Sequence, residues 1–521
     1  MNEKLISVDI STIPLPDDVI VTSGTYTYSG KVLVSYNTES DIDTTDYINL
    51  AILNDDGTDF KVIFSGVIPT KERNGGIRYM PYRDNKRILL GDYVLECTPD
   101  IDNCTSTEII LVVYPSTIED EAVTSRRWSE IIIAPDNIHI AWTSLLQNDD
   151  SAMLIGELAR DTENYVIVNP KIISTTLYFE EDPENDGFII PADVSRGGEV
   201  KQFVHGGNAI SLVGAMRYVT TDSIVQSLDS ENMTQITYTP GYDETTIFSP
   251  DEYLGIVMSS RFSETIDPAI FGIMPRPLYV GTRLNGILYY YTVQGARLVR
   301  EGNLGPALIE IERSINEDGY LGTMLSTDEN WVMRSPLSWH PDGKRTMWVE
   351  MPKGETDDLR LRLRKADLPD YEPQNPVPIV TTTDDIPYAV EDLAVLSSIN
   401  SNVEGKIAGK HSGYMYYSNS SSSSISGETE AQYENYSDDG VNFYNGYEKY
   451  SYNYLNESRY EADIQLTGEQ QGEMSLRATF SSITGDRPAS LLFETDEDGN
   501  PKSYGYTTYN DTTLNIEDLS A

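Results

Sequence analysis

The sequence repeats one short pattern, and this repeat limits the possible folds more than any other feature. Each copy has an apolar or aromatic approach, a tight turn at an aspartate and then a β-rich run. Four copies align closely, at residues 80–93, 132–145, 246–259 and 337–350. Their turns lie at Asp84, Asp136, Asp251 and Asp342. Because proline fixes φ before the turn, while Asp, Asn and Gly supply side-chain hydrogen bonds and left-handed backbone, each copy predicts a hairpin between two strands.

Three weaker copies lie between these hairpins, at residues 27–36, 203–214 and 282–292. Most intervals between neighbouring turns are close to the roughly 40 to 50 residues of a four-stranded propeller blade, although the interval from Asp251 to Asn285 is shorter. Further strand-turn-strand patterns follow at residues 47–63, 152–168 and 358–368. We therefore predict an all-β fold with a β-propeller over residues 25–370. About seven blades are expected, and six to eight are compatible with the spacing.

The turn sequences also resemble a known family. Ser249-Pro-Asp-Glu252, Ala134-Pro-Asp-Asn137 and His340-Pro-Asp-Gly343 look like the Ser/His-Pro-Asp-Gly-Lys signature of TolB-like propeller repeats. The copy at 337–350 is close to the family pattern, whereas Asn stands at positions 85 and 137 and Glu at 252. The resemblance implies a propeller with a central funnel. It implies no single activity, because such propellers serve both as docking platforms and as enzyme domains.

The rest of the chain divides into three regions. Residues 1–24 are expected to form an N-terminal strap, and the proline-rich residues 371–392 a linker or surface strap. Residues 393–521 are rich in tyrosine and predict a C-terminal antiparallel β domain, either a β-sandwich or an open sheet packed on the propeller. The run Ser418–Ser424 is interpreted as a flexible loop.

The charge balance excludes several partners. The chain has 37 Lys and Arg against 83 Asp and Glu, a formal net charge of -46. Such a field repels polyanions, which argues against nucleic acid and acidic lipid surfaces as partners. No apolar run is long enough for a membrane span. The acidity most simply serves solubility. No cofactor is indicated, although Ca²⁺ sites among the carboxylates are possible.

Cysteines and the N-terminus bear on the compartment. Cys97 and Cys104 could close a disulfide loop across a turn or remain thiols. The N-terminal residues lack the pattern of a signal peptide. We expect a secreted or extracellular protein whose signal is not part of this chain, with a cytoplasmic protein as the alternative.

No catalytic motif is present. The sequence has no nucleophile elbow, His-Glu-x-x-His zinc motif, phosphate-binding glycine loop or dinucleotide fingerprint, so catalytic residues and metal ligands stay unassigned. His205 and His340 occupy the same place just before a turn. A position shared between blades favours a structural role, and both are kept as candidate ligand-binding residues.

Other candidates lie upstream of the turns, where loops entering the innermost strands converge on the propeller axis. Arginine and tryptophan gather there, and together they could grip a carboxylate or a sugar, because Arg offers a planar fork and Trp a stacking face. The simpler interpretation is that the tryptophans are core residues and the arginines offset nearby carboxylates. These candidates are Arg78, Arg127, Trp128, Trp331 and Arg334.

Two functions of different classes follow. The leading hypothesis is recognition, in which the funnel and the tyrosine-rich domain bind a glycan or a protein ligand. The alternative is a carbohydrate-active enzyme, a polysaccharide lyase or glycoside hydrolase, with its active site in the funnel. A purely structural scaffold is a third, weaker option.

Overall fold

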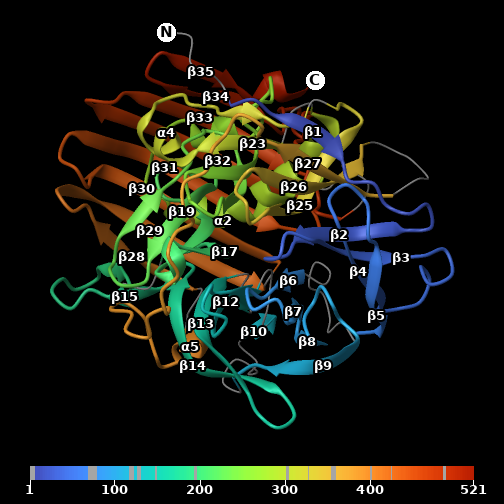
Figure 1. Ribbon diagram of the computed structural model, residues 1–521. Coiled ribbons are helices and arrows are strands. Elements are labelled where there is room, and N and C mark those ends of the chain that lie inside the picture. Colours follow the sequence, from blue (N-terminus) through green and yellow to red (C-terminus); the bar gives the residue numbers. More distant parts are fainter. Residues whose placement is uncertain are drawn as a thin grey trace.

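A computed structural model gives the arrangement of most of the chain (Figure 1). It describes residues 6–68, 79–115, 123–125, 131–146, 150–192, 196–300, 304–326, 328–353, 360–398, 402–423, 425–484 and 489–520. Four four-stranded sheets and a nine-stranded sheet made of two joined blades follow one another along the chain. The described residues thus form six blades, five of four strands and one of five, which confirms the predicted all-β propeller.

The strands of each blade follow in chain order. Blade 1 has β2 (Ile20–Tyr26), β3 (Val32–Asn37), β4 (Tyr47–Leu53) and β5 (Lys61–Val67). Blade 2 has β6 (Tyr79–Pro81), β7 (Arg87–Leu90), β8 (Tyr93–Thr98) and β9 (Ser106–Val113). Blade 3 has β10 (Val123–Ser125), β11 (Ile131–Ile133), β12 (His139–Leu146), β13 (Ser151–Arg160) and β14 (Tyr165–Thr175).

Blades 4 to 6 complete the ring. Blade 4 has β17 (Glu199–Val204), β18 (Ala209–Gly214), β19 (Asp222–Ser227) and β20 (Met233–Gln235). Blade 5 has β21 (Asp243–Phe248), β22 (Leu254–Ser259), β23 (Gly305–Glu310) and β24 (Thr323–Met324). Blade 6 has β25 (Trp331–Trp339), β26 (Arg345–Pro352) and β27 (Arg362–Asp367), and β1 (Asp9–Thr12) pairs with β27 as its outermost strand. The N-terminal segment therefore closes the ring.

The first strand of each blade is the innermost one. β2 contacts both β25 and β6, β17 contacts both β11 and β21, and β21 also contacts β25. The turns of the repeat, called the marked turns below, each join the first strand of a blade to the second, so they share one face of the propeller. The starts of the first strands and the connections between second and third strands share the opposite face.

One predicted copy of the repeat is wrong. Residues 282–292 lie in α2 (Tyr279–Tyr289) and the following π-helix η3 (Tyr290–Ala296), which belong to an insertion between β22 and β23. Leu284, Ile287 and Leu288 of α2 are fully buried, and their spacing is that of one helix face. Removing this copy reduces the preferred number of seven blades to six and explains the short interval. The insertion also contains α1 (Ala269–Gly272) and α3 (Arg297–Val299).

The predicted hairpin turns are confirmed. The Oδ1 atom of each turn aspartate accepts a backbone N–H two residues further on, as between Asp136 and Ile138 (2.8 Å) or Asp342 and Lys344 (2.8 Å). The next residue has positive φ, at 63° for Asn137 and 69° for Gly343. Asn replaces Gly without disrupting the turn because its short polar side chain tolerates this conformation.

Residues 371–392, here called the strap, run over the marked turns of blades 6, 5, 4 and 3 in that order. The hydroxyl of Tyr371 donates to Oδ2 of Asp251 (2.9 Å), and the N–H of Val380 donates to the carbonyl of Gly206 (3.0 Å). The N–H of Thr382 then donates to Oδ2 of Asp136 (3.1 Å). Asp136 and Asp251 therefore both shape their hairpins and hold the strap.

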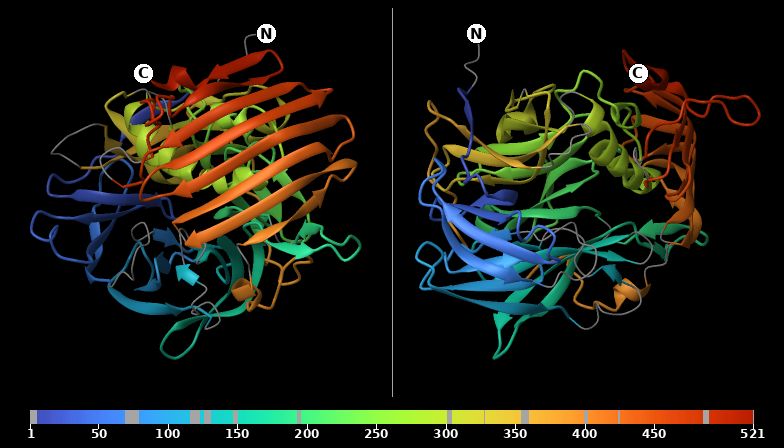
Figure 2. Two further views of the ribbon diagram at one scale, coloured as in Figure 1. Left: turned by 180° about the vertical axis from the view of Figure 1, so that it is seen from behind. Right: turned by 90° about the vertical axis from the view of Figure 1, so that its right-hand side faces the viewer.

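The C-terminal region forms one antiparallel sheet that lies behind the propeller (Figure 2). Of the two predicted alternatives it is the open sheet and not the β-sandwich, because helices of the blade 5 insertion, not a second sheet, cover its inner face. Most of the serine run lies inside β29, where backbone pairing with β30 orders it, so the flexible-loop interpretation is wrong. The strands are β28 (Val403–Ala408), β29 (Ser412–Ser423), β30 (Ser426–Ser437), β31 (Asn442–Asn453), β32 (Ser458–Gly468), β33 (Gly472–Phe480), β34 (Tyr504–Tyr509) and β35 (Thr512–Asn515).

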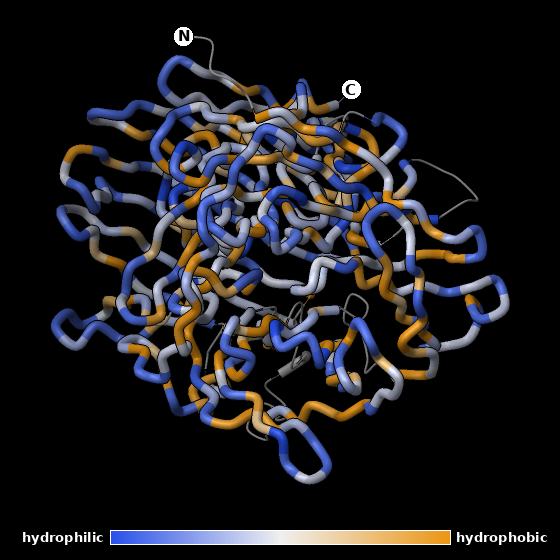
Figure 3. Tube along the Cα trace, in the orientation of Figure 1, coloured by the Kyte–Doolittle hydropathy of each residue, from blue (hydrophilic) through white to orange (hydrophobic). Residues whose placement is uncertain are grey.

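Short elements complete the structure. A hairpin between blades 3 and 4 is formed by β15 (Phe179–Glu181) and β16 (Ile189–Pro191). The short helices are η2 (His205–Gly207), α4 (Ile311–Asn316), α5 (Val395–Ser398) and η4 (Ile516–Ser520). No helix in the described part of the chain has the length and apolar character needed to cross a bilayer. Hydrophilic residues occupy exposed tips such as the β13–β14 hairpin at the bottom of Figure 3, whereas hydrophobic segments lie along the blades.

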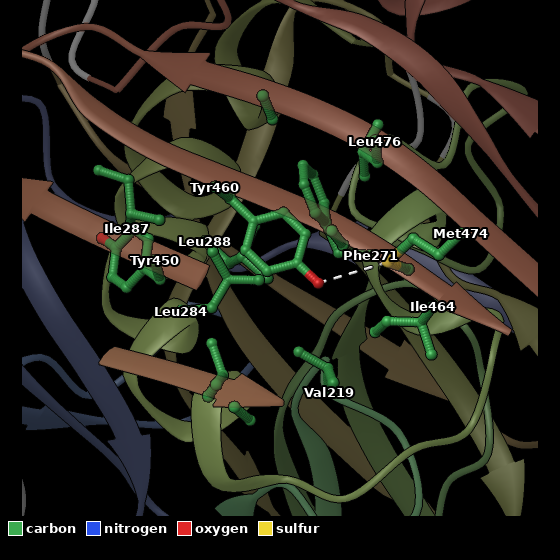
Figure 4. Close-up of a cluster of buried hydrophobic side chains, with 14 of the residues drawn as sticks. Val219, Phe271, Leu284, Ile287, Leu288, Tyr450, Tyr460, Ile464, Met474 and Leu476 are labelled. Atoms are coloured by element: carbon green, nitrogen blue, oxygen red, sulfur yellow. Dashed lines mark hydrogen bonds between the residues drawn. The ribbon is translucent and has the colours of Figure 1, made fainter. Parts of the chain in front are cut away.

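The sheet and the insertion share a core (Figure 4). Phe271 and Leu288 from the insertion pack with Tyr460, Ile464 and Met474 from the sheet. Successive side chains in a strand point to opposite faces of the sheet, so Tyr460 and Ile464, four residues apart on β32, lie on the same face.

A buried ion pair crosses this core. Nε of Arg276 donates to Oε2 of Glu448 at 3.0 Å, and both side chains have 0% exposure. The hydroxyls of Tyr433 and Tyr460 also donate to Glu448, at 2.6 and 2.8 Å. Nη1 of Arg276 donates to the carbonyl of Phe271 at 2.8 Å. Both charges of this pair are therefore partnered.

We expect Glu448→Gln to lower the free energy of unfolding by about 3–5 kcal/mol, because it leaves the guanidinium of Arg276 buried without a counter-charge. Urea unfolding measures the effect. Glu461→Gln is the matched control, since its partner Arg477 is 3.5 Å away on the outer face of the same sheet, and it should cost less than about 1 kcal/mol. Equal costs for the two variants would contradict the assigned role of the buried pair.

We expect Gly206→Ala to loosen the strap. Gly206 has φ of 69°, and a Cβ there would lie 2.1 Å from the carbonyl oxygen of Pro378 in the strap. Gly319 has φ of 75° with nothing within 4 Å, so Gly319→Ala measures the backbone strain alone, about 1–2 kcal/mol. Gly206→Ala should cost more and should speed proteolysis within 371–392. Identical stability and cleavage rates would show that the strap does not depend on this close approach.

Candidate functional site

His205 and His340 both lie on the face of the marked turns. The backbone N–H of His205 donates to Glu252 (2.6 Å), and its imidazole pairs with the same carboxylate at 2.9 Å. This hydrogen bond raises the pKa of His205. His340 is buried, packs edge-on against Tyr26 and accepts a hydrogen bond at Nε2 from Arg345 (2.8 Å). Burial lowers the pKa of His340, which favours the neutral acceptor. Both imidazoles thus have structural partners.

Trp331 does lie beside an arginine, but that arginine is already neutralised. The guanidinium of Arg362 stacks over its ring at 4.0 Å. Arg362 in turn donates to Glu350 at 2.7 Å and to Asp328 at 2.8 Å. Arg362 therefore offsets nearby carboxylates, while Trp331 is half-buried and not a core residue. Arg78, Arg127 and Trp128 lie outside the described residues.

Arg334 lies near the start of β25, the innermost strand of blade 6. Its side chain is exposed, on the face opposite the marked turns. Arg297 of α3 approaches it from the blade 5 insertion and donates through Nη1 to the carbonyl of Met333 (3.3 Å). Burial, and then the positive charge of Arg334, lower the pKa of Arg297. Two guanidinium groups from different elements are therefore within electrostatic range of each other.

Carboxylates and a lysine border this pair. Lys201 is buried on β17, with its Nζ 3.1 Å from Glu199 and 3.5 Å from Glu244. Glu244 lies near the start of β21 and is within electrostatic range of Arg297. We call Glu199, Lys201, Glu244, Tyr289, Arg297 and Arg334 the mouth cluster. It contains three cationic and two anionic side chains.

Tyr289 supplies the only phenol of the mouth cluster. It is the last residue of α2. Burial, and then the negative charge of Glu244, raise its pKa to about 12. The phenol therefore keeps its proton at neutral pH and can donate a hydrogen bond or a proton, but it does not act as a base there.

The sequence indicated only part of this cluster. Arg334 and Glu244 lie upstream of marked turns, where funnel residues were expected. Tyr289 and Arg297 were missed because their segment was assigned to a blade. The buried Leu284, Ile287 and Leu288 repeat at helical spacing, and this signal identifies the insertion as a helix.

The tyrosine-rich sheet offers a second surface. Most of its tyrosines pack inward, including Tyr417, Tyr433, Tyr450 and Tyr460, whereas Tyr447 is 40% exposed. The outer face carries cross-strand charges of alternating sign, such as Glu430 opposite Lys449. A depression of about 390 Å³ on this face is lined by Lys449, Ser451, Glu457, Arg459 and Glu461. Lys449, Glu457 and Glu461 pair with neighbouring charges of the same face, namely Glu428, Lys502 and Arg477, so the face is mainly a solvated surface.

The two cysteines are thiols. Cys97 and Cys104 are both buried and not joined by a disulfide in the structure. Burial, and then a hydrogen bond with Cys104, raise the pKa of Cys97. A raised thiol pKa disfavours the nucleophilic thiolate.

Comparisons with known proteins bear on the fold. No family model matches the chain, and no curated protein matches it. Solved structures similar to it include a putative TolB from Agrobacterium tumefaciens, with 12% identity over 59% of this chain and 80% of that chain and a TM-score of 0.31. TolB from Acinetobacter baumannii has 13% identity over 67% of this chain and 65% of that chain, with a TM-score of 0.31.

The β-propeller domain of the Trilobed protease from Pyrococcus furiosus is also similar. It has 9% identity over 96% of each chain, with a TM-score of 0.23. These neighbours share the propeller architecture at low identity. The assignment of a propeller to this chain rests on its own strand order.

Proposed function

We propose that the protein is a recognition module whose mouth cluster binds the carboxylate of an acidic glycan or peptide. The observation that carries the proposal is the approach of Arg297 and Arg334 from two different elements. Arg334 is exposed, and among the described residues no acceptor lies within hydrogen-bond distance of the buried Nε of Arg297. A ligand carboxylate would offer that acceptor and would relieve the repulsion between the two cations.

The surrounding residues support orientation of such a ligand. Lys201 is held between Glu199 and Glu244, so its charge is balanced by these carboxylates. Tyr289 keeps its proton and can donate to a sugar hydroxyl or a carbonyl oxygen. A ligand whose carboxylate lies between the two arginines and whose polar group faces Tyr289 would contact all three of these side chains.

An enzymatic role is the second candidate, favoured by one observation. The phenol of Tyr289 lies within electrostatic range of both Glu244 and Arg297. A protonated phenol beside a carboxylate and an arginine could assist cleavage of a uronate-containing polysaccharide, with the phenol as proton donor. The absorbance at 235 nm and new reducing ends, measured across a panel of polysaccharides, distinguish turnover from binding. Tyr289→Phe should abolish turnover if this candidate is correct.

We expect binding to require the ligand carboxylate. Isothermal titration with acidic oligosaccharides and their methyl esters, and with peptides carrying free or amidated C-termini, makes this comparison. The neutral form of the ligand should bind with roughly 10-fold to 100-fold lower affinity than the acid, because charge-assisted hydrogen bonds contribute about 1.5–3 kcal/mol. Equal affinity for the acid and its ester would contradict the proposal.

We expect Arg334→Gln and Arg297→Gln each to weaken the same binding to a similar extent while the circular dichroism spectrum stays unchanged. Arg83→Gln is the control, since Arg83 is exposed at a marked turn on the opposite face and loses the same charge. If Arg83→Gln weakens binding as much as Arg334→Gln does, the site is not at the mouth cluster.

A further inference from the structure

We propose that His139, Glu157 and Asp384 form a binding site for a divalent transition-metal ion, which fixes the strap to blade 3. One ligand atom from each side chain can be chosen so that all three lie within 4.8 Å of one another. The site lies on the face of the marked turns and does not involve the mouth cluster. It is independent of the proposed carboxylate binding.

Three separate elements supply the three side chains. His139 is the first residue of β12, and Glu157 lies directly opposite it on β13. Directly paired residues place their side chains on the same face of a sheet, about 5 Å apart at Cβ. Asp384 comes from the strap, and its carboxylate is 3.2 Å from Nε2 of His139. A shared ion would therefore connect the strap to two strands of one blade.

Asp136 orients the imidazole for metal binding. Its Oδ2 is 2.7 Å from Nδ1 of His139, and its two oxygens also accept the N–H groups of Ile138, His139 and Thr382. A carboxylate with this many donors is ionised and accepts the Nδ1 proton. Nε2 is then directed at Asp384, in the carboxylate–histidine–metal arrangement that fixes the tautomer in many metal sites.

The chemistry of the ligands favours a particular class of ion. One imidazole and two carboxylates suit Zn²⁺ and related first-row ions, whereas Ca²⁺ prefers oxygen ligands alone. His139 is buried, while the side chain of Asp384 is 64% exposed, so water can complete the coordination. Asn169 steadies Glu157 by donating to its Oε1 at 2.6 Å.

Lys171 is a further cation at the strap contact. It donates to the carbonyl of Asp384 at 2.6 Å and pairs with Glu391 at 3.1 Å. Without a metal, the imidazole of His139 links Asp136 to Asp384. Metal binding would replace the contact between Nε2 and Asp384 with coordination bonds, and a proton carried by Nε2 would pass to solvent. The strap would then be held more firmly over the turns of blades 3 to 6.

Zn²⁺ titration of the EDTA-stripped full-length protein tests the site. We expect one Zn²⁺ bound per chain, a higher unfolding temperature and slower proteolysis within 371–392. Ca²⁺ at the same concentration should produce none of these effects. Asp384→Asn and Glu157→Gln should each weaken Zn²⁺ binding by at least about tenfold, since even the loss of an outer partner costs roughly 10-fold to 100-fold.

Asp385→Asn is the matched control, because this neighbouring carboxylate is also exposed and loses the same charge. It should bind Zn²⁺ as the unsubstituted protein does. Asp384 is largely exposed, so its substitution should leave the fold intact even if a His139 variant does not fold. Two results would overturn the proposal: no saturable Zn²⁺ binding by the unsubstituted protein, or equal Zn²⁺ affinity of Asp384→Asn and Asp385→Asn.

Discussion

The buried ion pair between Arg276 and Glu448 determines how the two large parts of the molecule fit together. Neither charge reaches solvent, and each is stable only when the other faces it. The C-terminal sheet can therefore dock in only one position, with Glu448 over the insertion of blade 5. Hydrophobic contacts such as Phe271 against Tyr460 add area but little positional selectivity, because apolar burial is not directional. The ion pair supplies the position.

This docking also places the mouth cluster. A second pair, Arg283 with Asp150 at 2.5 Å, ties α2 to the connection between β12 and β13 of blade 3. With α2 held between the sheet and blade 3, its last residue Tyr289 and the following Arg297 reach the starts of the innermost strands. The opposite face has a different cover, since the strap uses the turn aspartates as acceptors. Each face of the propeller is thus occupied by a segment that is not part of the repeat.

The repeat could be read from the sequence because turn chemistry is local. Asp, Asn and Gly at fixed offsets determine a hairpin whatever surrounds it, and the turns at Asp136 and Asp342 form as expected. The segment 282–292 was misassigned because Asn285-Gly286 is typical of a turn, although Leu284, Ile287 and Leu288 have helical spacing. The interpretation of the serine run Ser418–Ser424 as a flexible loop was wrong for the opposite reason. The composition of the run suggests disorder. Its order comes instead from backbone pairing with the neighbouring strand, as between Asn419 and Thr429.

The candidate sites depend on long-range contacts, which sequence reasoning could not locate. Arg334 and Arg297 come from different elements, and Asp384 is far from His139 in the chain. Six similar blades offer six similar first strands, so the repeat alone cannot make one part of the axis chemically distinct. A distinct site requires a break in the repeat. Blade 5 provides it on one face through Tyr289 and Arg297, and the strap provides it on the other through Asp384. The departures from the repeat, rather than the repeat itself, are therefore where the specific chemistry of this propeller is concentrated.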